Sequence, residues 1–337
     1  MLRGGIVGFG RMGLTHYSIL NDHPEVKFVG ICDPSSFIRE QARWHLKVAT
    51  FDDHEKMIRS TSPDFLIVST PTFAHAAPLH FAIENGLHVF VEKPFSLSSK
   101  EGRDIVNRLT GKSLVHQVGY VYRFNDVLLN VKDLLVRHAI GELLTFKMEW
   151  HGRAVLRPSG TTWRAKRSQG GGCLYDFASH AVDLINYCFG PPERIIGSVL
   201  KRIFSRDVED AVFSTFIYND GLSGHLLSNW SDATYRKPTL RLEVLGSKGK
   251  IAADFHTYKV FFPDEPDIEG FNKGWNTRYI TDFVKPVRFY LRGFEYTRQL
   301  DHFISRIVDP DQPNVCSFHD GLATDMIIES IVNDSTR

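Results

Sequence analysis

The sequence predicts an α/β protein with two domains. The N-terminal domain is expected to hold a doubly wound parallel sheet, and the C-terminal domain a large, mostly antiparallel open sheet with helices. Two observations carry this prediction: short apolar runs alternate with helical segments over the first 120 residues, whereas tight turns join strand-like runs in the second half. Because 337 residues are too many for one core and suit two, we expect domains at residues 1–122 and 123–337.

The N-terminal elements follow from the apolar pattern. Strands are expected at residues 4–7, 27–32, 65–69, 88–91 and 114–118, with helices at 14–21, 36–46, 74–85 and 98–110 between them. Gly86 stands just past the third helix, where a glycine typically ends one. Alternation at this spacing indicates parallel pairing, because parallel strands need long crossover connections.

The pattern changes after residue 122. A helix is expected at about residues 126–138, a strand at 143–150 and, after a polar loop, a helix at about 174–187 that ends before Gly190 and two prolines. Strands follow at 195–204, 211–218, 224–229, 240–245, 250–253 and 258–262, then a surface loop at 263–274 and closing helices at about 294–307 and 318–332. Turn sequences at 219–221 and 246–249 predict antiparallel hairpins.

Composition argues against several classes of protein. A net charge of +1 gives no general attraction to nucleic acid or to an anionic membrane, and no apolar run approaches the roughly 18 residues of a membrane span. The chain enters a glycine-rich strand directly after residue 3, so no signal peptide is expected. Cys32, Cys173, Cys188 and Cys316 form no CxxC pair, which favours reduced, buried thiols in a cytoplasmic protein.

A glycine-rich turn follows the first strand and opens a helix. Its residues are Gly8, Phe9, Gly10, Arg11, Met12 and Gly13, a GxGxxG motif. Glycines let the backbone approach a pyrophosphate, and the helix N-terminus favours its negative charge. Asp33 ends the next strand 20 residues after Gly13, where an acid binds an adenosine ribose. The motif therefore predicts a Rossmann domain that binds NAD rather than being a purely structural turn; nearby Ser35, Ser36 and Arg39 leave NADP open.

Two further segments carry groups suited to acid–base chemistry. Lys93 follows a parallel strand, at the sheet edge where ligands bind, which favours a functional over a merely solvated lysine. On the helix predicted from residue 174, Asp176 and His180 are four residues apart, so the carboxylate can hold the imidazole and raise its basicity. His180 is then a candidate general base; the alternative is a buried polar pair. A zinc site on this helix face is ranked low, because no further ligand pair has suitable spacing.

The loop before that helix is basic. Residues 151–172 contain Arg153, Arg157, Arg164, Lys166 and Arg167 and no acid, which favours an anionic substrate such as a sugar phosphate, sugar acid or nucleotide sugar. A solvated loop, or contact with the cofactor's own pyrophosphate, remains the alternative. Trp163 is a candidate apolar face for a sugar ring.

With these segments in view, the chain resembles the glucose–fructose oxidoreductase/inositol dehydrogenase (Gfo/Idh/MocA) family over nearly its whole length. The resemblance rests on the GxGxxG turn, on Ser69, Thr70, Pro71 and His75, on the run from Gly86 to Pro94 with Glu92 and Lys93, on Gly119, Tyr120, Arg123 and Phe124, on the Asp176–His180 helix and on residues 245–249. It implies that Lys93, Asp176 and His180 assist proton transfer, that Thr70, Pro71, His75, Glu92 and Lys93 line the cofactor, and that Arg123, Arg153, Trp163 and Arg164 join the catalytic groups around the substrate. Thr72 and Ala178 depart from the residues frequent in the family.

The expected activity is hydride transfer between nicotinamide and a secondary hydroxyl or ketone of a sugar, polyol or anionic sugar derivative. In this scheme His180 takes the hydroxyl proton and Lys93 stabilises the developing alkoxide, with no metal. The alternatives are an NAD-dependent glycoside hydrolase that uses transient redox, a non-catalytic NAD(H) sensor and a metalloenzyme. The resemblance also implies a homodimer or homotetramer formed through the C-terminal sheet.

Overall fold

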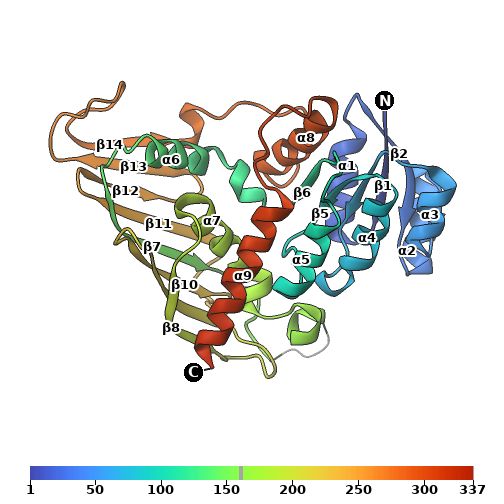
Figure 1. Cartoon of the computed structure of the whole chain (residues 1–337), viewed down its shortest axis with the longest axis horizontal. Helices are drawn as coiled ribbons and strands as arrows, with labels where there is room; N and C mark the ends of the chain where they lie inside the picture. Colours follow the sequence, from blue (N-terminus) through green and yellow to red (C-terminus); the bar gives the residue numbers. More distant parts are fainter. Residues whose placement is uncertain (159–161, 337) are drawn as a thin grey trace. The chain divides into compact units, whose positions relative to one another are not determined.

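The computed structural model describes residues 1–158 and 162–336, which form two compact units. The first contains Met1–Val121 and Pro286–Asp325, and the second contains Tyr122–Lys285 and Met326–Arg337. The sequence placed everything after residue 122 in one domain, whereas the structure returns residues 286–325 to the first unit. Figure 1 shows both units with most of their helices and strands labelled.

The sheet of the first unit has six parallel strands in the order β3-β2-β1-β4-β5-β6. They are β1 (Leu2–Val7), β2 (Val26–Cys32), β3 (Thr50–Phe51), β4 (Phe65–Val68), β5 (His88–Val91) and β6 (His116–Val118). This order reverses direction at β1, so the predicted doubly wound sheet is confirmed. The two-residue strand β3 was not predicted.

Six helices complete this unit: α1 (Arg11–Asn21), α2 (Ser36–Leu46), α3 (His54–Thr61), α4 (Ala76–Glu84), α5 (Ser99–Asn107) and α8 (Phe294–Val308), and α9 (Phe318–Ser335) begins here. Three of them start at side chains that accept a backbone N–H of the first turn: Ser35 from Ile38, Asp53 from Lys56 and Ser98 from Glu101. Helix α3 was not predicted, because its apolar pattern is confined to Met57 and Ile58.

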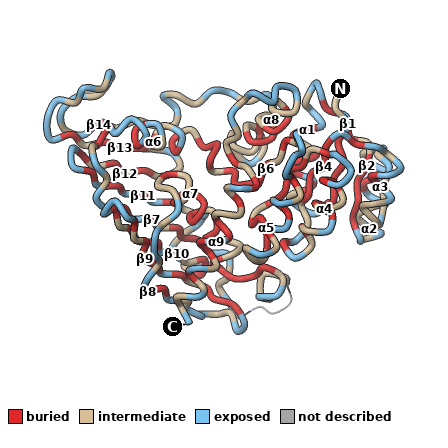
Figure 2. The backbone as a smooth tube through the Cα atoms, in the orientation of Figure 1, coloured by how far each residue is buried: buried red, intermediate tan, exposed pale blue. Residues whose placement is uncertain are grey.

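The central strands are buried on both faces. All four residues of β4 are inaccessible to solvent: Leu66 and Val68 belong to one apolar cluster, and Phe65 and Ile67 to another. Alternate residues of a strand point to opposite faces, so the two clusters are the cores on the two sides of the sheet. Figure 2 shows these strands as buried segments. Continuous apolar runs are typical of strands covered by helices on both sides.

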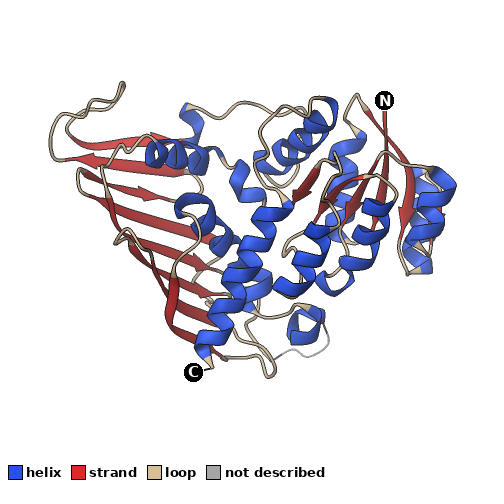
Figure 3. Ribbon diagram, in the orientation of Figure 1, coloured by secondary structure: helices blue, strands red, loops and turns tan. Residues whose placement is uncertain are grey.

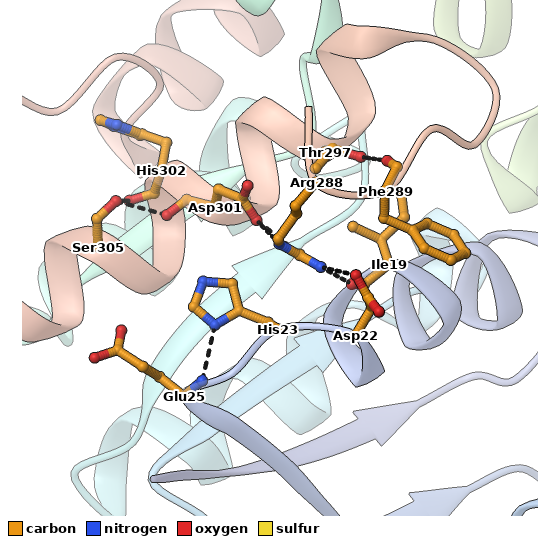
Figure 4. A network of polar contacts seen from close by, with 10 residues as sticks. All are labelled: Ile19, Asp22, His23, Glu25, Arg288, Phe289, Thr297, Asp301, His302 and Ser305. Atoms are coloured by element: carbon orange, nitrogen blue, oxygen red, sulfur yellow. Dashed lines mark hydrogen bonds and ion pairs between the residues drawn. The ribbon is translucent and has the colours of Figure 1, made fainter. Parts of the chain in front are cut away.

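Arg288 ties the returning segment to α1. Its guanidinium donates to the carbonyl oxygen of Ile19 at 2.7 Å, pairs with Asp22 at 3.3 Å and pairs with Asp301 of α8 at 2.7 Å (Figure 4). The contacts join residues 269 positions apart in the chain. No local sequence pattern signals such a pairing, which explains why the sequence left this segment in the second domain.

The second unit contains an eight-stranded sheet in the order β14-β13-β12-β11-β7-β10-β9-β8. Its strands are β7 (Leu143–His151), β8 (Arg194–Lys201), β9 (Ala211–Ile217), β10 (Ser223–Asn229), β11 (Thr239–Gly246), β12 (Gly249–Ala253), β13 (Thr257–Phe262) and β14 (Gly274–Tyr279). Every neighbouring pair is antiparallel except β7 with β10, so the prediction of a mostly antiparallel sheet is confirmed. Strand β14 was not predicted. Figure 3 shows the sheet's extent.

Helices α6 (Asp126–Val136) and α7 (Ser179–Phe189) share one apolar core with this sheet, together with Ile327 and Ile331 of α9. The strands alternate buried and exposed residues, as expected when one face packs and the other does not. The outward positions include apolar side chains, among them Val199, Phe213 and Leu227. No helix in the described ranges is long and apolar enough to cross a membrane.

Candidate functional site

The carboxyl ends of the parallel strands in the first unit are joined by main-chain hydrogen bonds. Gly8 N donates to Cys32 O at 2.8 Å, Ser69 N to Val7 O at 2.8 Å and Glu92 N to Val68 O at 2.9 Å. The residues just beyond β1, β2, β4 and β5 are therefore held in one row along this edge. The glycine motif, Asp33, Thr70 and Lys93, which the sequence predicted to bind ligands, all belong to this row.

The glycine turn has the geometry that a bound pyrophosphate requires. Gly8 has φ +85°, and a Cβ atom on Gly13 would lie 2.1 Å from the carbonyl oxygen of Gly8, so neither position accommodates a side chain. A Cβ on Gly10 would meet no protein atom within 4 Å. Helix α1 begins after Gly10 with Arg11 and Met12, and it has no side-chain cap and no acid in its first turn. The first N–H groups of α1 are thus available to an anion, and the turn fits a dinucleotide.

Asp33 is held against this turn. Its carboxylate accepts the backbone N–H of Phe9 at 2.8 Å and that of Ser35 at 2.9 Å, and the residue is only 6% exposed. Arg39 donates to the carbonyl oxygens of Asp33 and Pro34 at 2.8 and 2.9 Å. A fixed carboxylate and a guanidinium therefore stand together at the end of β2, the first suited to a ribose hydroxyl and the second to a phosphate.

The residues after β4 turn into a short 3₁₀ helix, Thr72–Ala74. His75 is buried, and its ring nitrogens lie 3.2 Å from Phe95 O and 3.0 Å from Thr70 O. Desolvation lowers the pKa of His75 below its usual value of 6.5. The imidazole thus links Thr70 to the segment after β5, and any contact of His75 with a cofactor stays a prediction.

Glu92 forms a buried pair with a residue that the sequence did not single out. His16 of α1 is fully buried, and its Nε2 lies 2.7 Å from Glu92 Oε1, while Glu92 Oε2 accepts the backbone N–H of Lys93 at 3.2 Å. Desolvation acts to raise the pKa of Glu92, but the hydrogen bond and charge of His16 and the charge of Lys93 together lower it. The carboxylate is therefore ionised at neutral pH and orders the backbone on which Lys93 stands. A histidine three residues after Gly13 was the one sequence signal for this pair.

The second set of predicted groups lies in the second unit, where the helix differs from the expected one. Residues Cys173–Ala178 form a π-helix, and the α-helix begins only at Ser179. Such wide turns are rare and are frequent at functional sites. Asp176 is in the π segment and accepts from Arg164 Nε at 2.6 Å. The expected Asp176–His180 contact, argued from α-helical spacing, stays a prediction.

His180, in the first turn of α7, is surrounded by aromatic rings. Its ring centroid lies 5.6 Å from that of Trp150 in a stacked arrangement and 4.9 Å from that of Tyr122, edge-on. Tyr122 in turn stacks on Phe255 with centroids 4.6 Å apart. These contacts fix the orientation of the imidazole, as a general base requires.

The basic loop is partly neutralised by acids. Arg164 pairs with Asp176 and lies over the ring of Trp163 at 4.7 Å, and Arg167 pairs with Glu209 at 3.2 Å. Arg153 forms a β-bridge with Ser231. Residues 159–161 of this loop lie outside the described residues.

Arg123 is not part of that loop. It is 2% exposed, donates to both carboxylate oxygens of Asp183 at 2.8 to 3.1 Å and lies over the ring of Tyr187 at 4.9 Å. Asp183 and Tyr187 both lie on α7, three and seven residues after His180. The guanidinium is engaged in a buried ion pair, so its predicted role in substrate binding stays a prediction and would act from within this pair.

Comparison with known proteins gives two family matches. Residues 2–120 match the NAD-binding Rossmann fold of the Gfo/Idh/MocA oxidoreductase family, and residues 128–252 match the GFO/IDH/MocA C-terminal domain. The scyllo-inositol 2-dehydrogenase (NAD(+)) of Bacillus subtilis strain 168 is 26% identical over 262 residues, which cover 74% of this chain and 73% of that protein.

Solved structures share the fold. A levoglucosan dehydrogenase in complex with NADH and levoglucosan superposes with a TM-score of 0.85 at 22% identity, covering 99% of this chain and 97% of that one. The WlbA dehydrogenase of Bordetella pertussis in complex with NADH and UDP-GlcNAcA has a TM-score of 0.81 at 20% identity, covering 99% and 96%. At these identities the likeness establishes the architecture, and the residues of this chain must carry the argument about chemistry.

Proposed function

Because this chain belongs to the Gfo/Idh/MocA family of NAD-binding oxidoreductases, we propose that it transfers a hydride between a nicotinamide and a secondary hydroxyl or ketone of an anionic sugar or polyol. The observation that carries the proposal is the geometry around His180: an imidazole oriented by Trp150 and Tyr122, on the helix whose π segment holds Asp176. The coarser activity, oxidoreduction of a sugar or polyol, is that of the family.

The proposed roles follow from the chemistry of each group. His180 accepts the proton of the reacting hydroxyl, and the charge of Asp176 stabilises the imidazolium that forms. Lys93, on the backbone ordered by Glu92, donates a hydrogen bond to the reacting oxygen and stabilises the alkoxide. When bound, the nicotinamide supplies the hydride acceptor.

For the cofactor we favour NAD over NADP. The carboxylate of Asp33 is fixed by the buried N–H group of Phe9 and the partly buried N–H group of Ser35, so it cannot turn away from a 2′-phosphate without leaving both donors unpaired. Arg39 is engaged with two carbonyl oxygens of the same turn and would have to leave them to meet that phosphate.

The outer face of the eight-stranded sheet is the proposed contact between subunits of a homodimer or homotetramer. Exposed apolar residues on it, among them Val199, Phe213 and Leu227, are interspersed with polar ones. We also keep the expectation of a cytoplasmic protein. Size-exclusion chromatography with light scattering measures the subunit number.

The first test is a titration of the protein with NADH and with NADPH. Binding is monitored by energy transfer from the five tryptophans to the bound nicotinamide. A panel of neutral and anionic sugars is then incubated with protein and NAD, and both NADH and sugar products are quantified. Stoichiometric NADH with a keto-sugar is the expected result. Free sugar released from a glycoside without net NADH would instead indicate a hydrolase that uses transient redox. Cofactor binding without turnover of any sugar would contradict the proposal and favour a sensor.

A glycine variant separates cofactor contact from folding. Gly10→Val places its side chain where no protein atom lies within 4 Å, so the melting temperature should stay within about 2 °C of the parent protein, while NADH affinity falls at least about tenfold because the backbone can no longer approach the pyrophosphate. Unchanged NADH affinity would contradict the placement of the cofactor at this turn.

A further inference from the structure

A pocket of about 440 Å³ in the second unit lies between the start of the basic loop and Trp230. Three of its lining residues are arginines, and none is an acid. The lining residues include Arg153, Arg157, Arg164, Thr162, Ser205 and Trp230. Its volume lies within the range of small-molecule sites.

The walls of this pocket are fixed by the sheet. Ala154 N donates to Trp230 O at 2.7 Å, and Gly152 N donates to Asn229 O at 2.9 Å, so the chain after β7 continues to pair with the chain after β10. The indole of Trp230 is fully buried, and its N–H donates to Asp210 at 2.7 Å. Arg153 therefore starts from a rigid backbone rather than from a freely moving loop.

The pocket has an excess of positive charge. Arg164 shares its charge with Asp176 at 2.6 Å, whereas within residues 1–158 and 162–336 no carboxylate lies at ion-pair distance from Arg153 or Arg157, and both are exposed.

The acid behind the wall, Asp210, does not offset these charges. Its carboxylate accepts three backbone N–H groups of residues 203–205, the hydroxyl of Ser205 and the indole N–H of Trp230. Desolvation acts to raise the pKa of Asp210, but these hydrogen bonds hold it below its usual value. Its lone pairs are occupied by donors other than the arginines, which leaves two guanidinium groups for a ligand.

We propose that this pocket binds the phosphoryl group of the sugar substrate, an inference that rests on the proposed dehydrogenase function. A phosphate monoester carries a charge of about −1.5 to −2 and three acceptor oxygens, which matches two guanidinium groups better than a single carboxylate does. Arg164 connects the pocket to the chemistry, because it lines the wall and also binds Asp176, four residues before His180. A phosphoryl group in the pocket therefore places the rest of the sugar toward this helix.

The kinetic test compares glucose with three charged derivatives of it, glucose 6-phosphate, UDP-glucose and glucuronate, each with NAD and the intact protein. We expect kcat/KM to be at least about 100-fold higher for one phosphorylated sugar than for its neutral counterpart. Glucose 6-phosphate and UDP-glucose distinguish a monoester from a nucleotide diphosphate. A preference for glucuronate, or equal rates with all four, would overturn the proposal and leave the dehydrogenase function standing.

The double variant Arg153→Gln/Arg157→Gln tests the residues. It should lower kcat/KM for the phosphorylated sugar by about 10²–10⁴, since each charge-assisted hydrogen bond contributes roughly ten- to hundredfold. The affinity for NADH should stay within about twofold of the parent protein. The matched control is Arg137→Gln, an exposed arginine at the end of α6 whose charge is paired with Asp133; it should change neither kcat/KM for the phosphorylated sugar nor the affinity for NADH. Equal losses in the control and the double variant would contradict a specific role for the pocket.

A binding experiment separates this inference from the proposed function. Calorimetric titration with inorganic phosphate and with pyrophosphate, in the presence of saturating NADH, should show binding that the double variant loses. Binding lost in the variant together with no oxidation of any sugar would support the phosphoryl pocket and contradict the dehydrogenase. If neither anion binds but a sugar is oxidised, the phosphoryl pocket is contradicted and the dehydrogenase function is supported.

Discussion

The carboxyl edge of the parallel sheet and the helix that carries His180 both hold residues of the proposed mechanism, and different interactions position these residues. At the sheet edge, main-chain hydrogen bonds between the strand ends hold the residues in a row. Gly8 and Gly13 stand there at positions that cannot accommodate a side chain. Around the helix, ion pairs position the side chains, and the paired residues lie 12 to 60 positions apart in the chain. These pairs are Arg164 with Asp176, Arg167 with Glu209 and Arg123 with Asp183.

The difference teaches where each region is vulnerable. Backbone hydrogen bonds survive most side-chain substitutions, so changes at the sheet edge should alter ligand binding more than stability. Around the helix, the Arg123–Asp183 pair is buried on both sides. Removing one partner of such a pair leaves a buried charge uncompensated, so a change there should alter stability as well. Four groups of substitutions test this contrast.

The largest expected effect is on turnover. Lys93→Ala in the first unit and His180→Ala in the second should each lower kcat by about 10²–10⁴, because in the proposed mechanism His180 accepts the proton and Lys93 stabilises the alkoxide. NADH affinity, measured by energy transfer from tryptophan, should stay within about threefold. The control is Lys100→Ala, an exposed lysine of α5. If kcat of Lys93→Ala stays within tenfold of the parent protein, the proposed catalytic role of Lys93 at the sheet edge is contradicted.

The second effect is on stability. Arg123→Ala leaves the carboxylate of Asp183, only 1% exposed, without its bidentate donor, and should lower the free energy of unfolding by about 3–5 kcal/mol. Arg108→Ala breaks exposed pairs with Glu84 and Asp104 in the first unit and should cost at most about 1 kcal/mol. Urea denaturation of both variants measures the difference. Equal losses would mean that the ion pairs around the helix are no more important than surface pairs.

The third effect depends on pH and probes the buried pair of Glu92 and His16 at the sheet edge. The pKa of Glu92 is lowered in the folded protein, so its pairing with His16 stabilises the fold above the unfolded value of 4.5 and is lost as the pH falls through the folded value. Glu92→Gln should therefore cost about 1.5–3 kcal/mol at pH 7 and progressively less below pH 4.5. Thermal unfolding of parent and variant between pH 3 and 7 measures the gap. A gap that is constant over this range would contradict the ionised pair.

The smallest effect is on cofactor choice. Asp33→Ala should weaken NADH binding about tenfold and reduce the preference for NADH over NADPH. The substitution removes both the proposed acceptor for the ribose hydroxyl and the charge that repels a 2′-phosphate. Arg39→Ala serves as the opposite case and should affect only NADPH. If instead NADPH binding falls in Asp33→Ala, the carboxylate mainly shapes the turn through Phe9 and Ser35.

Much of the fold could be predicted because its signals are local. The GxGxxG turn, the apolar runs of β4 and β5 and the hairpin turns of the second sheet each depend on residues close in the chain. The strand β3, with two residues, and helix α3, with two buried apolar side chains, carried too little pattern to be seen. The helix around Asp176 was predicted as regular because its π segment, Cys173–Ala178, is only six residues long. The wider turn of a π-helix does not show in the spacing of side chains over so short a segment.

The sequence by itself thus determined the two-sheet architecture, the glycine turn with its acid and the residue types available for proton transfer, since periodicity and turn chemistry act over a few residues. Only the tertiary structure decided that residues 286–325 return to the first unit, that Glu92 is held by His16, that Arg164 binds Asp176 and that Arg123 is buried on Asp183. Each of these depends on a charged or polar group meeting a partner far away in the chain. Which partner it meets is set by how the apolar faces pack, because burial leaves such a group stable only where its charge or hydrogen bonds are matched.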